Sequence, residues 1–121
     1  MSTRILVVED HPTNRRILRD LLTSAGYELT EAVTGEDGVA LAETCRPDLI
    51  LMDIQLPGFD GYEATRRIKE NPALRRIPII AVTSYALNGD EERALEAGCE
   101  AYVSKPFSPR VVLAKIRDCL S

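Results

Sequence analysis

Residues 47–61 read PDLILMDIQLPGFDG and indicate the architecture of the whole chain. The run Leu49–Met52 is short, apolar and uninterrupted, which is typical of a strand covered on both faces in a parallel sheet. It ends in Asp53, and an ionised carboxylate is costly to bury without a partner. Asp53 is therefore expected either at an exposed edge of the sheet or beside a group that pairs with its carboxylate.

Similar strand patterns recur along the chain, with helical patterns between them. The other strands are predicted at 5–9 (ILVVE), 27–32 (YELTEA), 77–83 (IPIIAVT) and 100–104 (EAYVS), and the central one at 48–53. Apolar residues at helical spacing form two stripes that we expect in the core: Ile17, Leu18, Leu21, Leu22 and Ala25, then Val112, Leu113, Ile116 and Leu120. Capping residues predict helix starts at Asp60, Asn88 and Ser108, and glycines predict helix ends near Gly26 and Gly98.

Five strand–helix units predict an α/β fold with helices on both faces of a parallel sheet. Right-handed crossovers leave few topologies, and the order 2-1-3-4-5 is one of the two common doubly wound arrangements. We therefore expect one flavodoxin-like (βα)5 domain over residues 1–121.

The composition is that of a globular domain, with 45% hydrophobic and 28% charged residues. The net charge of -4 argues against a nucleic-acid-binding surface. No apolar run approaches the ~20 residues of a membrane span, and the N-terminus does not read as a signal peptide. Cys45, Cys99 and Cys119 are odd in number and widely spaced, so we expect reduced thiols in a cytoplasmic protein.

Polar residues follow four of the predicted strands where those strands end. In doubly wound sheets, ligands bind at the carboxyl ends of the strands, so these groups should converge on one rim. They are Glu9 and Asp10 after the first strand, Asp53 after the third, Thr83 and Ser84 after the fourth, and Lys105 after the fifth.

Three carboxylates packed together repel one another, and a divalent cation would remove that repulsion. Oxygen ligands without nearby His or Cys favour Mg²⁺, held by two carboxylates, a backbone carbonyl just past Asp53 and waters. An aspartate carboxylate is also a known nucleophile toward phosphoryl groups. Lys105 could neutralise the charge of the transferring group, and Thr83 could donate a hydrogen bond to it.

Each of these residues also has a plainer interpretation when taken alone. A lone Asp53 or Lys105 would be an ordinary surface residue, and Thr83 would be a β-branched strand residue. Tyr102 could be a static, half-buried ring. His11, the one histidine of the sequence, is expected as a loop or cap residue, with metal ligation as the alternative. The convergence of Asp53 with Asp10 and Lys105 is what favours the functional interpretation.

The motifs Glu9-Asp10, Asp53 in LILMDIQLPGFDGYE, Thr83 in AVTSYA, and YVSKP at 102–106 together resemble the receiver domain of bacterial two-component response regulators. The resemblance covers essentially the whole chain. It implies that Asp53 accepts a phosphoryl group from a sensor histidine kinase or a histidine phosphotransfer protein.

The resemblance also implies the roles of the other residues. Mg²⁺ would be bound by Asp10, Asp53 and the Gln55 carbonyl, with Glu9 acting through metal-bound water. Thr83 and Lys105 would hold the phosphoryl group, at a site that the small Ser84 keeps open. Tyr102 would be a switch aromatic that turns inward with Thr83, on a face between the fourth strand and the fifth helix that binds a downstream protein. Lys105-Pro106 would be a cis peptide.

Other functions remain alternatives at this point. A phosphatase of the haloacid dehalogenase type shares the aspartyl nucleophile, but Gln55 stands where those enzymes have a second aspartate, and no cap insertion is present. A phosphate-independent docking module would have no need of the unpaired acids. A flavin-binding relative of the fold would need a glycine-rich phosphate loop, which DHPTN (10–14) is not.

Overall fold

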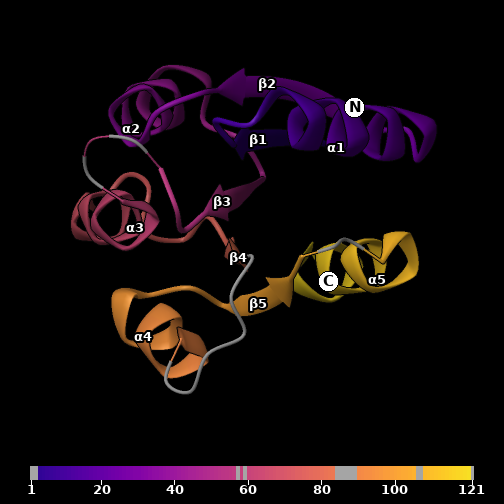
Figure 1. The fold of residues 1–121 in the computed structure, drawn as a ribbon. Helices are drawn as coiled ribbons and strands as arrows, with labels where there is room; N and C mark the ends of the chain where they lie inside the picture. The colour runs from indigo at the N-terminus through magenta and orange to yellow at the C-terminus, as the bar shows by residue number, and fades with distance from the viewer. Residues whose placement is uncertain (1–2, 57, 59, 84–89, 106–107, 121) are drawn as a thin grey trace.

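A computed structural model describes residues 3–56, 58, 60–83, 90–105 and 108–120. These residues form a five-stranded parallel sheet of order β2-β1-β3-β4-β5. Helices α2, α3 and α4 cover one face of the sheet, and α1 and α5 cover the other (Figure 1). The expected doubly wound α/β fold is thus confirmed, including its strand order.

The strands and helices alternate along the chain. The strands are β1 Arg4–Val8, β2 Glu28–Ala32, β3 Leu49–Asp53, β4 Ile79–Thr83 and β5 Ala101–Ser104. The helices are α1 Pro12–Ser24, α2 Gly35–Cys45, α3 Gly61–Glu70, α4 Asp90–Ala97 and α5 Pro109–Leu120.

The central strands are the most deeply buried elements. Every residue of β3 and of β4 is buried, which explains why both read as continuous apolar runs. The fourth strand begins at Ile79, two residues later than predicted, and Pro78 precedes it without a backbone N–H to contribute to the ladder. The Pro78 carbonyl still accepts a hydrogen bond from Ile50 N at 2.9 Å.

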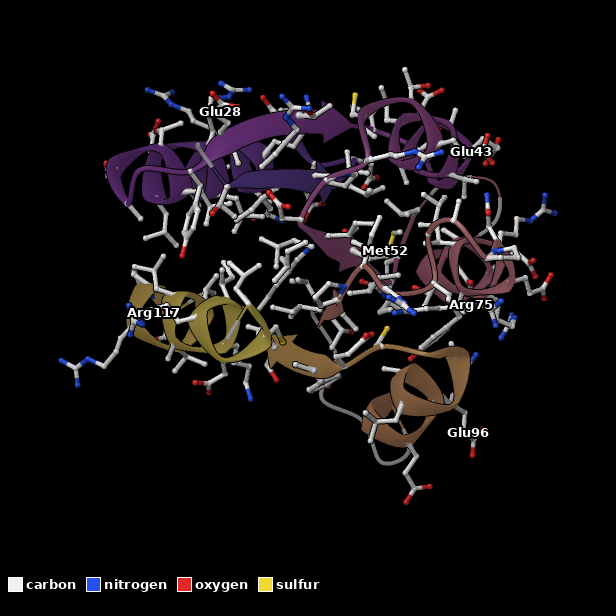
Figure 2. The ribbon with its side chains drawn as sticks, turned by 180° about the vertical axis from the view of Figure 1, so that it is seen from behind. Glu28, Glu43, Met52, Arg75, Glu96 and Arg117 are labelled. Carbon is white, nitrogen blue, oxygen red and sulfur yellow. The ribbon has the colours of Figure 1, made fainter. Side chains whose placement is uncertain are left out.

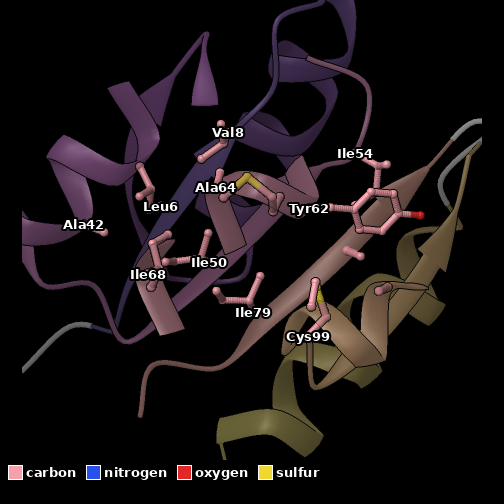
Figure 3. Packing of buried hydrophobic residues seen from close by; sticks show 14 of the residues in the cluster. Leu6, Val8, Ala42, Ile50, Ile54, Tyr62, Ala64, Ile68, Ile79 and Cys99 are labelled. Carbon is pink, nitrogen blue, oxygen red and sulfur yellow. The ribbon is translucent and has the colours of Figure 1, made fainter. Parts of the chain in front are cut away.

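Each face of the sheet has its own hydrophobic core. The first lies under α2, α3 and α4 and includes Leu6, Ile50, Ile68 and Ile79, with Tyr62 and Cys99 at its edge (Figure 3). The second lies under α1 and α5 and is built around Leu18, Leu22, Leu51 and Ile116. Figure 2 shows Met52 in the middle of the sheet, whereas charged side chains such as Glu43 and Glu96 point outward.

The apolar stripe predicted on α1 is only partly buried in the core. Leu18 and Leu22 of α1 are buried and Leu21 is partly buried, but Ile17 is 44% exposed and Ala25 is exposed. Ile17 is adjacent to Leu18 along the helix, about 100° around its axis, so both cannot face the sheet fully. The stripe on α5 is confirmed, with Val112 and Ile116 buried and Leu113 and Leu120 partly buried.

The predicted helix ends are confirmed where the structure describes them. The Asp60 side chain accepts a hydrogen bond from Glu63 N at 3.0 Å and caps α3. Gly26 and Gly98 adopt φ of 91° and 113°, the left-handed conformation that ends helices. The expected cap at Asn88 and the expected cis peptide at Lys105-Pro106 lie outside the described residues.

Candidate functional site

The carboxyl ends of β1 and β3 bring three acidic side chains together. Glu9, Asp10 and Asp53 each offer a carboxylate oxygen, and these oxygens all lie within 4.8 Å of one another. Glu9 and Asp53 are buried, with 1% and 3% of their surface exposed, whereas Asp10 is exposed. The predicted convergence of the acids on one rim of the sheet is therefore confirmed.

Lys105, which directly follows β5, reaches across β4 to this cluster. Its Nζ lies 3.1 Å from Asp53 Oδ2 in a hydrogen-bonded ion pair. It also lies 2.8 Å from Glu9 Oε1, although the angles there are not those of a hydrogen bond. The position is fixed by the backbone, because Lys105 N donates to the Thr83 carbonyl at 2.7 Å.

The electrostatics of the cluster follow from burial and like charge. Burial, followed by contact with Asp53, raises the pKa of Glu9, while Lys105 and the His11 backbone N–H oppose that rise. Burial would lower the pKa of Lys105, but its contacts with Glu9 and the charge of Asp53 outweigh burial and raise that pKa. One ammonium therefore compensates only part of the negative charge of three carboxylates.

Backbone N–H donors hold two of the carboxylates in place. Gln55 N donates to Asp53 Oδ1 at 3.0 Å, and His11 N donates to Glu9 Oε2 at 3.1 Å. His11 also occupies the N-cap position of α1 without a side-chain capping bond. The plainer interpretation of His11 as a cap residue is thus the one that fits.

Arg15 on α1 organises the acidic loop, and sequence reasoning missed it. Its Nη1 donates to the carbonyls of Glu9 at 3.1 Å and Asp10 at 2.9 Å. Its Nε lies 3.9 Å from Glu31 Oε1 on β2. The guanidinium therefore ties the loop that carries both acids to the first helix. The spacing of five residues between Asp10 and Arg15 predicts this contact only when the path of the loop back toward α1 is already known.

Gly61 is a second residue that sequence reasoning missed. It is buried at the start of α3, and its N donates to the Ile54 carbonyl at 3.0 Å. A Cβ at this position would lie 2.2 Å from the Asp53 carbonyl oxygen and 2.8 Å from Ile54 Cα. Only glycine allows α3 to begin this close to the backbone that carries Asp53.

The remaining predicted residues lie at the same rim or next to it. Thr83 is buried at the end of β4, beside Ser104 of β5 in register. Gln55 is exposed two residues past Asp53. Tyr102 is partly buried on β5 and packs against the core under α2, α3 and α4. Ser84 lies outside the described residues.

The cluster has the chemistry of a magnesium site. All its donors are oxygens, and hard oxygen ligands suit Mg²⁺. Glu9 Oε1 is buried and has no hydrogen-bond partner among the described residues, where Lys105 is the one cation paired with it, so a metal cation would add charge compensation. The residues present fit a divalent cation.

The fold and the site together define a signalling module of the receiver type: a doubly wound sheet with buried acids and a lysine at its carboxyl edge. Comparison with known families agrees, because the model of the response regulator receiver domain matches residues 5–117. The chain belongs to this family, and its members interact with histidine kinases or phosphotransfer proteins.

Individual relatives give the same result. The chain is 49% identical to the polar-differentiation response regulator DivK of Brucella anthropi over 113 residues, which cover 93% of this chain and 92% of that protein. It is 48% identical to DivK of Brucella ovis with the same coverage. The chain is therefore related over most of its length to DivK-type response regulators.

Solved structures extend the comparison to the site. A putative response regulator from Chloroflexus aurantiacus superposes with a TM-score of 0.96 at 30% identity, covering 99% of this chain and 98% of that one. The receiver domain of sensor histidine kinase PA1611 from Pseudomonas aeruginosa gives 0.92 at 42% identity with the same coverage. That structure has a magnesium ion coordinated in its active-site cleft.

Within the described ranges, none of the helices combines the length and the apolar character needed to cross a membrane.

Proposed function

We propose that Asp53 is the phosphoacceptor of a Mg²⁺-dependent signalling switch formed by residues 1–121. The observation that carries the proposal is the Asp53 carboxylate itself. It is buried, fixed by Gln55 N at one oxygen, and paired with Lys105 at the other, at 3.0 and 3.1 Å respectively. A carboxylate held in this way is pre-oriented for attack on a phosphoryl group.

The chemical step needs little beyond positioning and charge neutralisation. An Asp53 oxygen forms a bond to phosphorus as the phosphorus–nitrogen bond of a phosphohistidine breaks, and the imidazole nitrogen retains the electron pair. Lys105 stays close enough to pair with an oxygen of the transferred group. The Thr83 hydroxyl donates a hydrogen bond to another oxygen of that group.

Asp10, Asp53 and the Gln55 carbonyl would hold Mg²⁺, with Glu9 bound through water. The cation supplies charge neutralisation during phosphoryl transfer. The 4.8 Å cluster of carboxylate oxygens supports this assignment, since it concentrates negative charge that one lysine compensates only in part.

The new phosphoryl group adds about -1.5 to -2 of charge at pH 7 next to Thr83 and Lys105. Thr83 moves toward it and Ser84 leaves it room, and Tyr102 on the adjacent strand turns inward into the space that opens. Tyr102 is only partly buried, and Thr83 lies in β4 two ladder positions beyond Ala81, the residue that pairs with Tyr102, which supports a coupling between the two. The face from β4 to α5 then binds a downstream protein, without nucleic acid or membrane, in the cytoplasm.

The experiment is to incubate the protein with a small-molecule phosphoryl donor, with and without Mg²⁺, and to measure the mass of the intact protein by mass spectrometry. We expect a gain of one phosphoryl group that requires Mg²⁺ and is absent from Asp53→Asn. Asp20→Asn, at an exposed position on α1, is the matched control and should gain the group as the wild type does. No gain under any condition would refute the proposal and favour a phosphate-independent docking module.

A further inference from the structure

A second concave site lies at the opposite edge of the sheet from Asp53. It is an open concavity of about 720 Å³, a volume within the range of small-molecule sites, and its arginines are exposed to solvent. Its lining residues come from the amino ends of β1, β3 and β4 and from the end of α5, and they include Arg4, Arg46, Asp48, Arg76, Pro78 and Leu120. Asp48 directly precedes β3 and Asp53 is its last residue, five positions further along, which puts this site roughly 16 Å from the acidic cluster.

Three guanidinium groups and one carboxylate line this arginine pocket, which gives its walls a net charge of +2 in a chain whose net charge is -4. The Asp48 carboxylate already has a partner within the chain, because its Oδ2 accepts a hydrogen bond from Arg4 N at 2.8 Å. Arg4 itself is partly used, since Nη1 donates to the Cys45 carbonyl at 3.2 Å and Nη2 lies 3.7 Å from Glu28.

Arg46 and Arg76 differ from Arg4 in their side-chain contacts. Neither forms an ion pair or a side-chain hydrogen bond with any residue that the structure describes, although both line the same concavity. Arginines near the end of a helix often donate hydrogen bonds to its last carbonyls. Arg4 on β1 does this for α2, because it donates to the Cys45 carbonyl. Arg46 and Arg76 have no such bond within the described ranges, so their guanidinium groups are available to a ligand.

The backbone at Arg46 gives an independent indication. Arg46 ends α2 in the left-handed conformation, with φ 46° and ψ 66°, and it is the one non-glycine residue with positive φ among those described. This position is ordinarily glycine or asparagine, because a Cβ is disfavoured there. Residues kept in such conformations are concentrated at ligand sites. An arginine here is therefore retained at a cost to the fold.

We propose that the arginine pocket binds a small molecule carrying an oligophosphate group. Guanidinium groups pair with phosphate oxygens through two parallel hydrogen bonds, and three of them around one space suit a chain of phosphates better than a single small anion. Pro78 and Leu120 add apolar surface beside the charges, which gives room for the body of a nucleotide. This site is separate from Asp53 and does not depend on its phosphorylation.

The experiment is calorimetric titration of the full chain with tripolyphosphate, ATP, GTP, citrate and heparin, in EDTA so that no metal bridges an anion to the acidic cluster. The variants are Arg76→Ala and Arg46→Gly, with Arg75→Ala as the matched control. Arg75 is the neighbouring exposed arginine after α3, labelled in Figure 2, and it does not line the pocket. Arg46→Gly removes the backbone strain, so we expect its melting temperature to be unchanged or higher while its affinity falls.

We expect one-to-one binding that weakens about tenfold or more in Arg76→Ala and Arg46→Gly and changes less than twofold in Arg75→Ala. Equal affinities for tripolyphosphate and the nucleotides would identify the phosphate chain as the ligand, and a tenfold preference for a nucleotide would identify a nucleotide. Citrate binding as tightly as tripolyphosphate would overturn the assignment to phosphate. Absence of binding, equal losses in all three variants, or affinity only for long polyanions such as heparin would overturn the site.

Discussion

The substitution Gly61→Ala tests whether the site depends on the close approach of α3 to β3. The new Cβ would lie 2.2 Å from the Asp53 carbonyl oxygen, and such contacts are essentially never shorter than 3.0 Å, so the backbone must move by at least roughly 0.8 Å. Overpacking of this kind costs about 1–3 kcal/mol, and the better helix propensity of alanine returns at most ~1. We expect a net loss of about 2 kcal/mol.

For a chain of 121 residues, that loss corresponds to a decrease of roughly 8 °C in melting temperature. The displaced carbonyl belongs to Asp53, so Mg²⁺-dependent phosphorylation should slow as well, because misplacement by ~1 Å can cost ~100-fold in rate. Thermal denaturation and the rate of phosphoryl gain measure the two effects. Gly26→Ala is the control: it has a left-handed φ but no atom within 4 Å of the new Cβ, and it should lose stability without slowing phosphorylation. Wild-type melting temperature and rate in Gly61→Ala would refute the reasoning.

Three further predictions concern single side chains. Lys105→Met leaves Glu9 and Asp53 without their ammonium and should destabilise the metal-free protein by about 3 kcal/mol in urea denaturation, with part of the loss restored by Mg²⁺; an equal loss with and without Mg²⁺ would count against a cation site. Burial raises the pKa of the Cys99 thiol from 9.0 to about 11, so its contribution to stability is full below pH 9 and is lost as pH rises through 11. Unfolding free energy should therefore fall by about 1 kcal/mol more in wild type than in Cys99→Ala between pH 8 and 10, and parallel pH profiles would contradict this. Asp60→Ala removes the cap of α3 and should cost about 1 kcal/mol, measured as a decrease of roughly 4 °C in melting temperature, whereas an unchanged value would show that the bond to Glu63 N contributes nothing.

The fold was accessible from the sequence because the strands of a doubly wound sheet are buried on both faces. Runs such as Leu49–Met52 therefore lack the alternation of half-exposed strands. Crossover rules left few topologies, and the observed strand order is one of the two common doubly wound arrangements among them. Ile17 was misplaced because helical periodicity defines a broad face and does not say which edge of it the sheet covers. That edge depends on how α1 is oriented against the sheet, which no local pattern specifies.

The acids and the lysine of the site were accessible because strand ends in a parallel sheet share one edge. Arg15 and Gly61 were not, because their contacts depend on how a loop folds back and how closely a helix starts. An arginine on an exposed helix and a glycine before a helix are common in any sequence. The arginine pocket was missed for a related reason, since Arg4, Arg46 and Arg76 are far apart in the chain and only the sheet brings them together.

The central claim is that the phosphoryl group resides on Asp53 as an acyl phosphate. The direct measurement is to treat the phosphorylated protein with hydroxylamine, which converts an acyl phosphate to a hydroxamate and releases phosphate, and then to locate the modification by peptide mass spectrometry. We predict one hydroxamate, at Asp53, in samples phosphorylated with Mg²⁺ and none in samples without it. A hydroxamate at Glu9 or Asp10 in place of Asp53, or a phosphate on a hydroxyl side chain that hydroxylamine does not release, would contradict the account.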